Sequence, residues 1–376
     1  MLSVILTISS VCLLPYLILR AEKSVKIVQW LSAVVCCYGI GIILGNVALN
    51  FWSTGIAKSV SEFSVLLALP LLLFSTDIPA WLKLAKSTII SFIFVVISVM
   101  LIAFTAGKLF SHADPDVWKM AGMMVGVYTG GTPNLMAIGK ALEVRDDVFV
   151  MLNAVDVILG GFYLLIIMSF GVKLLGKFLP AFDHESYIHG DAELVNWRGL
   201  KLGKKFLNGF ILTLLGLVSV LVAVGLSRLI TGTDSVSVIM LGLTTVSVGF
   251  SFFAPIRKLK GSQEMGQYLL LVFCVAVGSL ANFSEVSIDS LWYILFGGFI
   301  LFGSILLHFL CCFFLKIDRD TAIITSMAGI FGPAFVAPMS QVLRNQAILF
   351  SGVTTGLVGY AIGNFAGIFI AYLLKG

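Results

Sequence analysis

A membrane-length apolar segment over residues 117–140 is interrupted at its centre by residues that break a helix. Gly130, Gly131 and Pro133 fall within the run Thr-Gly-Gly-Thr-Pro-Asn over residues 129–134. Because proline donates no backbone hydrogen bond, a regular helix loses a partner at Pro133. Inside a bilayer, broken backbone is tolerated only where protein or a water-filled cavity satisfies it. We therefore expect a broken helix that lines the protein interior.

A second break follows in the other half of the chain. Residues 329–338 read Gly-Ile-Phe-Gly-Pro-Ala-Phe-Val-Ala-Pro, and Pro333 matches Pro133 at a shift of 200 residues. Two interrupted segments at corresponding places in two halves are the main sequence pointer to the binding site of a secondary transporter. We expect the two breaks to lie together near the centre of the bilayer and to share one polar pocket.

The composition places the whole chain in a membrane. Hydrophobic residues make up 59% of the 376 positions and charged residues only 11%, whereas a water-soluble domain has about 25% charged residues. The net charge of +5 is concentrated in loops, where it carries information on topology and does not indicate a nucleic-acid partner. We expect a multi-pass protein of the cell (inner) membrane, surrounded by the lipid bilayer.

Twelve hydrophobic segments follow one another along the chain, and a spanning helix needs about 20 apolar residues. We predict an all-α integral membrane protein of about 10–12 transmembrane helices. The longest polar stretch divides it almost in half. The predicted division is a first repeat over residues 1–176, a cytoplasmic connecting loop over 177–205 and a second repeat over 206–376.

Lysine and arginine in short loops indicate the orientation of the helices. Lys23 and Lys83 in the first half, and Arg257 and Lys316 in the second, mark the cytoplasmic side. If successive segments cross the membrane in alternating directions from these cytoplasmic loops, the two repeats have inverted topologies. Six full crossings in each half would instead make the repeats parallel, so one segment of the first half does not cross. The sequence leaves open which segment this is.

Asp156 is the strongest single candidate for a functional residue, because a carboxylate inside a transmembrane segment costs about 2.5–3.5 kcal/mol on insertion scales. Asn153 lies three residues earlier on the same helical face, and the pair offers a proton site or a Na⁺ site. A structural aspartate that hydrogen-bonds to the broken neighbour is the alternative. The expected ion and substrate site combines these two residues with both breaks and the last helix: Asp156, Asn153, Thr129, Gly130, Gly131, Thr132, Pro133, Asn134, Gly329, Gly332, Pro333, Thr354 and Thr355.

Enzymatic chemistry has no support in the sequence. The chain contains no nucleotide-phosphate loop, zinc motif or nucleophile–base pair. The six cysteines lie in apolar stretches, where cysteine serves as a small apolar residue. We expect no enzyme activity and no cofactor, with Na⁺ or H⁺ acting only as a coupling ion.

With these motifs in hand, the chain resembles the YjcL-like family of uncharacterised membrane proteins. The resemblance rests on residues 69–77, 128–135, 153–156, 269–278 and 330–338 and covers nearly the whole chain. That family is distantly similar to sodium/proton antiporters and bile-acid:sodium symporters. The resemblance implies two inverted repeats with two broken helices that cross, here 117–140 and 321–343. It also implies a core domain, from about 60–176 and 266–376, that moves against a scaffold domain, from about 1–55 and 206–255.

The sequence therefore predicts a cation-coupled secondary transporter of a small anionic solute, working by alternating access. One alternative is a sodium/proton antiporter without an organic substrate. Another is a membrane receptor or assembly subunit that transports nothing. A homodimer is among the assemblies that the sequence leaves open.

Overall fold

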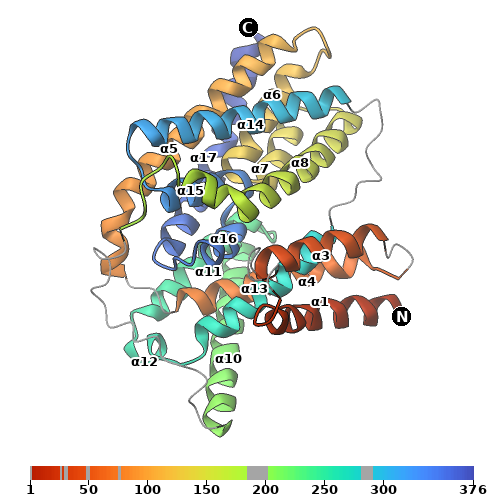
Figure 1. Ribbon diagram of the computed structural model, residues 1–376. Coiled ribbons are helices and arrows are strands. Elements are labelled where there is room, and N and C mark those ends of the chain that lie inside the picture. The colour runs from red at the N-terminus through yellow and green to blue at the C-terminus, as the bar shows by residue number, and fades with distance from the viewer. Residues whose placement is uncertain are drawn as a thin grey trace. The chain divides into compact units, whose positions relative to one another are not determined.

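The computed structural model describes residues 2–25, 28, 33–47, 51–74, 78–183, 202–280 and 291–376, and within these ranges its regular structure is helical (Figure 1). Seven of the described helices are long and apolar enough to cross a membrane. The predicted all-α membrane fold is thereby confirmed. These candidate spans are Ser3–Ala21, Thr54–Leu73, Lys86–Leu109, Asp147–Leu175, Gly203–Thr231, Leu291–Phe314 and Leu349–Lys375.

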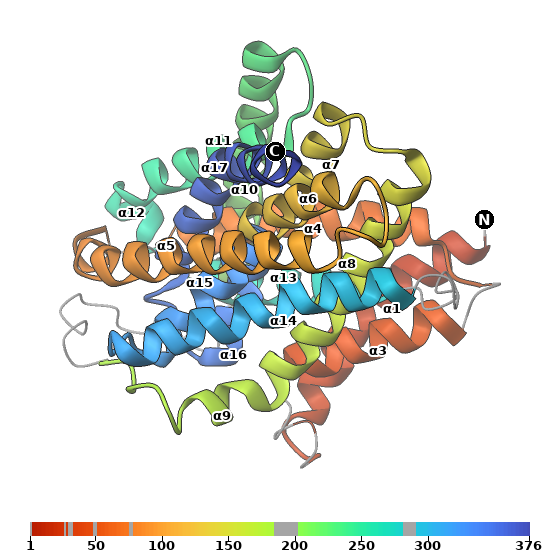
Figure 2. The ribbon, with the colours of Figure 1, turned by 90° about the horizontal axis from the view of Figure 1, so that it is seen from above.

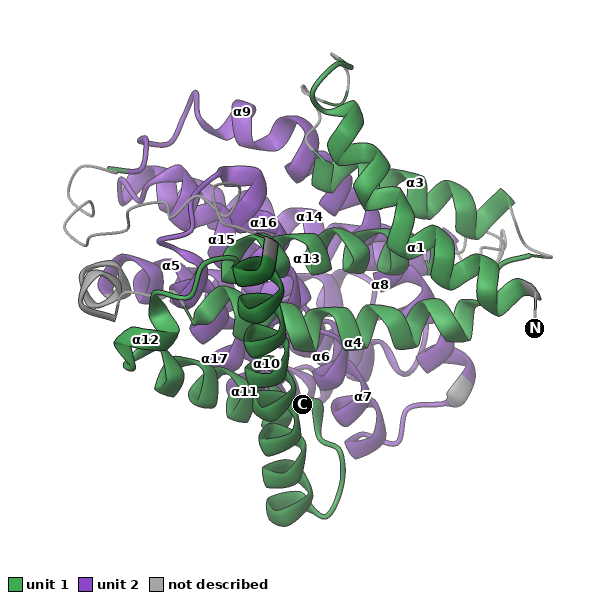
Figure 3. Ribbon diagram, turned by 90° about the horizontal axis from the view of Figure 1, so that it is seen from below, with its two compact units in different colours: residues 1–82, 183–282 green, residues 83–182, 283–376 purple. Residues whose placement is uncertain are grey.

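The chain divides into two compact units, and each unit draws on both halves of the sequence (Figure 3). Unit 1 comprises Met1–Leu82 and Asp183–Asn282, and unit 2 comprises Lys83–Phe182 and Phe283–Gly376. The segments 60–82 and 266–282, expected in the core domain, lie in unit 1. The roles of core and scaffold concern movement, so they remain predictions. Most of the expected connecting loop 177–205 lies outside the described residues.

Unit 1 is built around α13 (Ser262–Gly278), which packs on both α3 (Ala33–Val47) and α4 (Thr54–Leu73). Gly41 and Gly278 allow the backbones of α3 and α13 to touch, since a side chain at Gly278 would collide with the carbonyl of Tyr38. At the start of α13, the Ser262 hydroxyl donates to the carbonyl of Leu71 on α4. The remaining helices of this unit are α1 (Leu2–Ala21), α10 (Leu202–Thr231), α11 (Val236–Ser251) and α12 (Ala254–Arg257).

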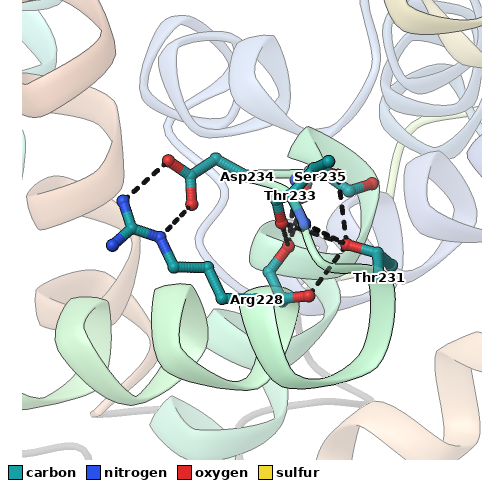
Figure 4. Close-up of polar contacts among 6 residues, drawn as sticks. Arg228, Thr231, Thr233, Asp234 and Ser235 are labelled. Carbon is teal, nitrogen blue, oxygen red and sulfur yellow. Dashed lines mark hydrogen bonds and ion pairs between the residues drawn. The ribbon is translucent and has the colours of Figure 1, made fainter.

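The turn between α10 and α11 is closed by polar side chains (Figure 4). Arg228 donates through Nε and Nη2 to the two carboxylate oxygens of Asp234, at 2.6 and 2.9 Å. This pairing lowers the pKa of Asp234 below its ordinary value. The Thr231 hydroxyl donates to the carbonyl of Thr233 at 3.0 Å, which fixes the chain between them.

Unit 2 contains the two broken segments. Its long helices include α5 (Ile78–Leu109, in this unit from Lys83 onward) and α14 (Leu291–Phe314), which run side by side in opposite directions (Figure 2). Ile102 meets Gly303 near the middle of this pair, and the rings of Phe110 and Phe296 lie 5.6 Å apart at one end. α8 (Asp146–Ile166) continues through a π-helical turn (Ile167–Gly171) into α9 (Val172–Leu175) and packs on α14.

The first broken segment folds back on itself as a helical hairpin. α6 (Val117–Gly130) and α7 (Thr132–Ala141) pack against each other. A side chain at Gly139 would lie 3.1 Å from the Met123 Cε atom, and Lys119 Nζ donates to the carbonyl of Glu143 at 3.2 Å. Residues before α6 thus lie next to residues after α7. The helix was expected to cross the membrane; this expectation is wrong, because the chain reverses direction at Gly131.

The second broken segment forms a matching hairpin. α15 (Arg319–Phe331) is followed by a 3₁₀ turn (Pro333–Phe335) and α16 (Val336–Leu343). Asn345, which follows α16, donates through Nδ2 to Asp320 Oδ2 at the start of α15, at 3.0 Å. The expected crossing of the segment 321–343 is therefore also wrong. Both segments are broken as predicted, but each returns to the side from which it started.

The last helix, α17 (Leu349–Lys375), connects the two hairpins. Near its start, a side chain at Gly356 would lie 2.8 Å from the Pro333 nitrogen. Near its end, Lys375 Nζ lies 4.9 Å from the Trp118 ring at the start of α6. At 1.5 Å per residue, α17 is about 40 Å long, close to the summed lengths of α6 and α15. The hairpins therefore approach from opposite ends of α17, and their tips meet beside its first half, at Gly356 and Gly359.

Candidate functional site

The tips of the two hairpins are glycines with almost the same unusual backbone conformation. Gly131 has φ 87° and ψ −177°, and Gly332 has φ 73° and ψ −172°. Residues with a side chain are strongly disfavoured in this region of conformational space. A side chain added at Gly131 would lie 3.4 Å from the carbonyl atoms of Phe331 and 3.5 Å from the nitrogen of Gly332. The two breaks therefore lie in contact, as expected, whereas their depth in the bilayer and a shared polar pocket remain predictions.

Small residues hold the first tip against α17. Three glycines on α6 face three on α17 at four-residue intervals: Gly122, Gly126 and Gly130, and Gly359, Gly363 and Gly367. Side chains added to these glycines would collide with the opposite backbone, with Asn134 or, at Gly126, with the side chain of Ile138 on α7. This is the small-residue packing that brings membrane helices into backbone contact. The conformation of the first tip therefore depends on the packing of a whole helix pair.

Asn134 attaches the first tip to α17 through a buried hydrogen bond. It is 1% exposed, and its Nδ2 donates to the carbonyl of Gly359 at 3.1 Å. Side chains added at Gly130 and at Gly363 would both collide with this nitrogen. The Asn134 amide thus uses one of its donors to bind α7 to α17.

Asp156 on α8 lies beside the meeting point of the tips. Its carboxylate acts electrostatically on the hydroxyl of Tyr128, which is buried near the end of α6. Gly160, four residues later on the same face of α8, contacts the ring of Phe331 next to the second tip. Among the described residues, Asp156 has no hydrogen bond or ion pair. A half-buried carboxylate without a fixed partner is free to bind a proton or a cation.

Aromatic side chains surround the second tip. The rings of Tyr163 and Phe331 are stacked with centroids 6.1 Å apart, and Tyr163 Oη lies 2.8 Å from Ser326 Oγ. The hydroxyl of Tyr360 on α17 lies against Gly332, since a side chain at that glycine would approach it to 2.9 Å. These contacts place two tyrosines of different helices within reach of one backbone break.

The structure brings most of the predicted site residues together, with differences in their surroundings. Thr129 is fully buried, and its hydroxyl has no hydrogen-bond partner within the described part of the chain. The hydroxyls of Thr354 and Thr355 donate to their own helix, to the carbonyls of Phe350 and Gly352, each at 2.8 Å. Asn153 lies half-buried on α8, one turn before Asp156.

Three tyrosines near the tips escaped the sequence analysis: Tyr128, Tyr163 and Tyr360. Aromatic residues make up 12% of the chain, so nothing in the pattern separates these three from the others. The glycine spacing on α6 and α17 was a usable signal. It predicts that these helices pack together, and hence that Tyr128 and Tyr360 come close to the breaks.

The open ends of the two hairpins are closed by charged groups. At the first, Arg145 Nη2 lies 2.9 Å from Asp114 Oδ2, and Arg145 is half-exposed. At the second, the fully buried Asp320 accepts from Asn345 Nδ2 across the open end at 3.0 Å and lies 2.7 Å from Arg319 Nη2 on its own helix. Asp318 caps α15 by accepting from the backbone N–H of Thr321 at 2.8 Å, and burial raises the pKa of this carboxyl.

Comparison with known proteins agrees with this membrane architecture. A model of the family described as "Protein of unknown function (DUF819)" matches residues 10–376. The chain belongs to the DUF819 family. It is 22% identical over 361 residues to the uncharacterized membrane protein YjcL of Bacillus subtilis (strain 168), covering 91% of this chain and 90% of that relative. The resemblance to YjcL-like proteins and the multi-pass membrane location are both confirmed.

Proposed function

We propose that this DUF819 protein is a secondary transporter that moves a small anionic solute together with Na⁺ or H⁺. The observation that supports this most strongly is the contact between Gly131 and Gly332, the tips of two opposed hairpins, beside the carboxylate of Asp156. Non-helical backbone at membrane depth is expected to line a site or a cavity. In transporters, such interrupted helices provide the groups that bind substrate and coupling ion.

The helix ends at the tips offer both signs of partial charge. α6 and α15 end there, so their C-terminal carbonyls point toward the break and favour a cation. α7 begins there, and its N-terminus favours an anion. This helix N-terminus has few free N–H groups for binding an anion, because Pro133 has no N–H and the N–H of Asn134 already donates to the carbonyl of Gly131 at 3.0 Å. The coupling ion therefore has stronger support at this site than the anionic solute.

The hairpins also reconcile the loop charges with the number of crossings. If α6–α7 and α15–α16 do not cross, five crossings remain in each half of the chain. An odd number inverts the second half relative to the first, as the lysine and arginine pattern requires. One hairpin then enters from outside and the other from the cytoplasm, which gives the two sides of an alternating-access site. We place the protein in the cell membrane.

A sodium/proton antiporter is the second candidate, since Asp156 alone is enough to carry an ion. The single intramembrane carboxylate at the tips favours symport with a solute over exchange of two cations. A receptor or assembly subunit would need no break at the tips, because continuous helices would support the same bundle without it.

Flux in proteoliposomes tests the proposal. The purified protein is reconstituted, a mixture of small metabolic anions is added outside, and the liposome contents are measured by mass spectrometry. An inward Na⁺ or H⁺ gradient should cause at least one anion to accumulate above the level in protein-free liposomes. Cation exchange without any anion uptake would favour the antiporter. Absence of both fluxes under either gradient would favour the receptor.

A further inference from the structure

A basic surface lies in unit 1, where the connection between α11 and α13 meets the start of α10. The connection over residues 252–261 reads Phe-Phe-Ala-Pro-Ile-Arg-Lys-Leu-Lys-Gly and contains α12. Asn208 on α10 donates through Nδ2 to the carbonyl of Lys260 at 3.2 Å. Lys204 lies one turn before Asn208 on the same helical face. Two segments distant in the sequence thus contribute to one basic surface, formed by Lys204, Arg257, Lys258 and Lys260.

Apolar side chains fix the position of this connection. Just before it, the ring of Phe250 packs edge-on against Phe74 of the same unit, with centroids 5.8 Å apart. Within it, Ile256 and Leu259 pack against a buried cluster that includes Phe74 and Leu212. The basic residues therefore stand on an anchored segment whose apolar residues face the interior of the unit.

The basic side chains are accessible and have no acidic partner. Arg257 and Lys258 lie between the two apolar anchors and are exposed, as is Lys204. Within the part of the chain that the structure describes, none of the four basic residues forms an ion pair. Glu264, in the first turn of α13, is exposed and also forms no ion pair with a described residue. The positive charge of this surface is thus left for a partner outside the protein.

Exposed aromatic residues place this surface at the boundary of the hydrocarbon layer. Phe252 and Phe253 precede α12 and are 67% and 62% exposed, and Phe206 near the start of α10 is 78% exposed. α10 has 30 residues and is about 45 Å long, so it extends beyond a hydrocarbon core of about 30 Å. Basic residues beside exposed phenylalanines are typical of segments that lie between acyl chains and headgroups.

We propose that the basic surface binds the phosphate headgroups of anionic phospholipids in the cytoplasmic leaflet. Arginine and lysine form strong, charge-assisted hydrogen bonds with phosphate oxygens. The pattern of loop charges assigns this end of α10 to the cytoplasm, where the membrane surface is negative. The exposed phenylalanines favour a lipid over free phosphate, because they offer contacts to acyl chains. This binding site lies in unit 1 and is independent of transport at the hairpin tips.

Lipid titration of the purified protein in detergent tests this proposal. Native mass spectrometry counts the bound molecules of phosphatidylglycerol, which is anionic, or of phosphatidylcholine with the same acyl chains, which is zwitterionic. We expect the wild type to bind phosphatidylglycerol at least about tenfold more tightly. Inorganic phosphate is added in a separate titration, and it should not displace the anionic lipid at equal concentration.

A triple substitution locates the site. Arg257→Gln, Lys258→Gln and Lys260→Gln together should weaken phosphatidylglycerol binding by at least about tenfold, since each basic residue near an anionic surface contributes about fivefold. Binding of phosphatidylcholine should stay unchanged. The matched control neutralises three exposed lysines of unit 2 and changes the net charge equally: Lys108→Gln, Lys140→Gln and Lys375→Gln. The control should bind both lipids as the wild type does.

Thermal unfolding in detergent gives a second measurement. A ligand that binds only the folded protein raises the midpoint of unfolding. Phosphatidylglycerol should therefore raise the midpoint of the wild type and of the control more than phosphatidylcholine does. The triple variant at residues 257–260 should lose this difference, and its midpoint without added lipid shows that it is folded. If it does not fold, Arg257→Gln alone should weaken phosphatidylglycerol binding by about fivefold.

Three results would overturn the lipid site. Equal binding of the two lipids by the wild type would show that the surface does not recognise a negative headgroup. Equal losses in the two triple variants would assign the effect to net charge. Displacement of the lipid by inorganic phosphate would identify a site for the free anion. None of these results bears on transport, which the flux experiment decides separately.

Discussion

Glu143 and Arg344 occupy corresponding positions in the two hairpins. Both are non-glycine residues in the left-handed region, with φ 50° and 54°. Each follows its tip glycine, Gly131 or Gly332, by the same distance, so one shift of 201 residues relates both pairs. Left-handed non-glycine residues are uncommon, and their recurrence at one shift supports a common origin for the two hairpins. Glu143 and Arg344 end the second helix of each hairpin, at opposite ends of α17.

The opposed hairpins predict the sidedness of their open ends. Lys140 and Ala347 are exposed near the open ends of the first and second hairpin. In a background without the six native cysteines, Lys140→Cys should react with a membrane-impermeant thiol reagent added outside intact cells. Ala347→Cys should react only after the membrane is permeabilised. Labelling of both positions from the same side would contradict the opposed arrangement.

Gly131→Ala should destabilise the protein through its backbone alone. The added Cβ makes only ordinary contacts, with 3.4 Å as the shortest, whereas φ 87° is strained for any residue with a side chain. We expect the free energy of unfolding to fall by about 1–3 kcal/mol, measured by denaturation in detergent micelles. Gly225→Ala on α10, where an added Cβ would meet no atom within 4 Å beyond its own helix, is the control and should leave stability unchanged or raise it by up to about 1 kcal/mol. Equal effects of the two substitutions would show that the tip is not strained.

Gly363→Ala should loosen the first hairpin from α17. Its Cβ would collide with Asn134 Nδ2, which donates to the Gly359 carbonyl. Overpacking of this kind costs about 1–3 kcal/mol, and loss of the buried hydrogen bond adds to it. Gly249→Ala on α11 has open space around it and is the matched control. Thermal unfolding in detergent should show a lower midpoint for Gly363→Ala alone, and an unchanged midpoint would argue against close α6–α17 packing.

The polar interactions that close the open ends of the two hairpins should contribute differently to the free energy of unfolding. Asp320 is fully buried and contacts both Arg319 and Asn345, so Asp320→Ala should cost about 3–5 kcal/mol, as for a broken buried pair. Arg145 is half-exposed and its ion pair is screened by solvent, so Arg145→Ala should cost far less. Denaturant titrations of both variants give this comparison. The reverse order of effects would mean that the second hairpin is not held closed by Asp320.

The breaks and Asp156 could be predicted because each violates a strong rule of membrane helices. Glycine and proline at Gly131, Pro133 and Pro333 end regular hydrogen bonding, and a carboxylate in a span is costly. The reversal of direction could not be read from these residues, because a broken helix either continues or turns back according to its packing. The two prolines also do not occupy corresponding positions in the hairpins. Pro333 directly follows its tip glycine, Gly332, whereas Thr132 separates Gly131 from Pro133.

A buried hydrogen-bonded cluster around His308 on α14 was beyond sequence reasoning for a different reason. Ser91, Thr325 and His308 come from three helices far apart in the chain and follow no common spacing. Serine and threonine are ordinary residues of membrane helices, where they bond to their own backbone. Only the packing of α5, α14 and α15 reveals that these three side chains form one chain of hydrogen bonds.

Gradient-driven uptake by Asp156→Asn proteoliposomes tests the central claim most directly. The substitution keeps the size of the side chain and removes its ability to carry a proton or bind Na⁺ as a carboxylate. With matched amounts of folded protein in the liposomes, the wild type should accumulate anion in response to the gradient. Asp156→Asn should show no gradient-dependent uptake. Full uptake by Asp156→Asn, with the same pH and Na⁺ dependence as the wild type, would contradict the assignment of coupling to this site.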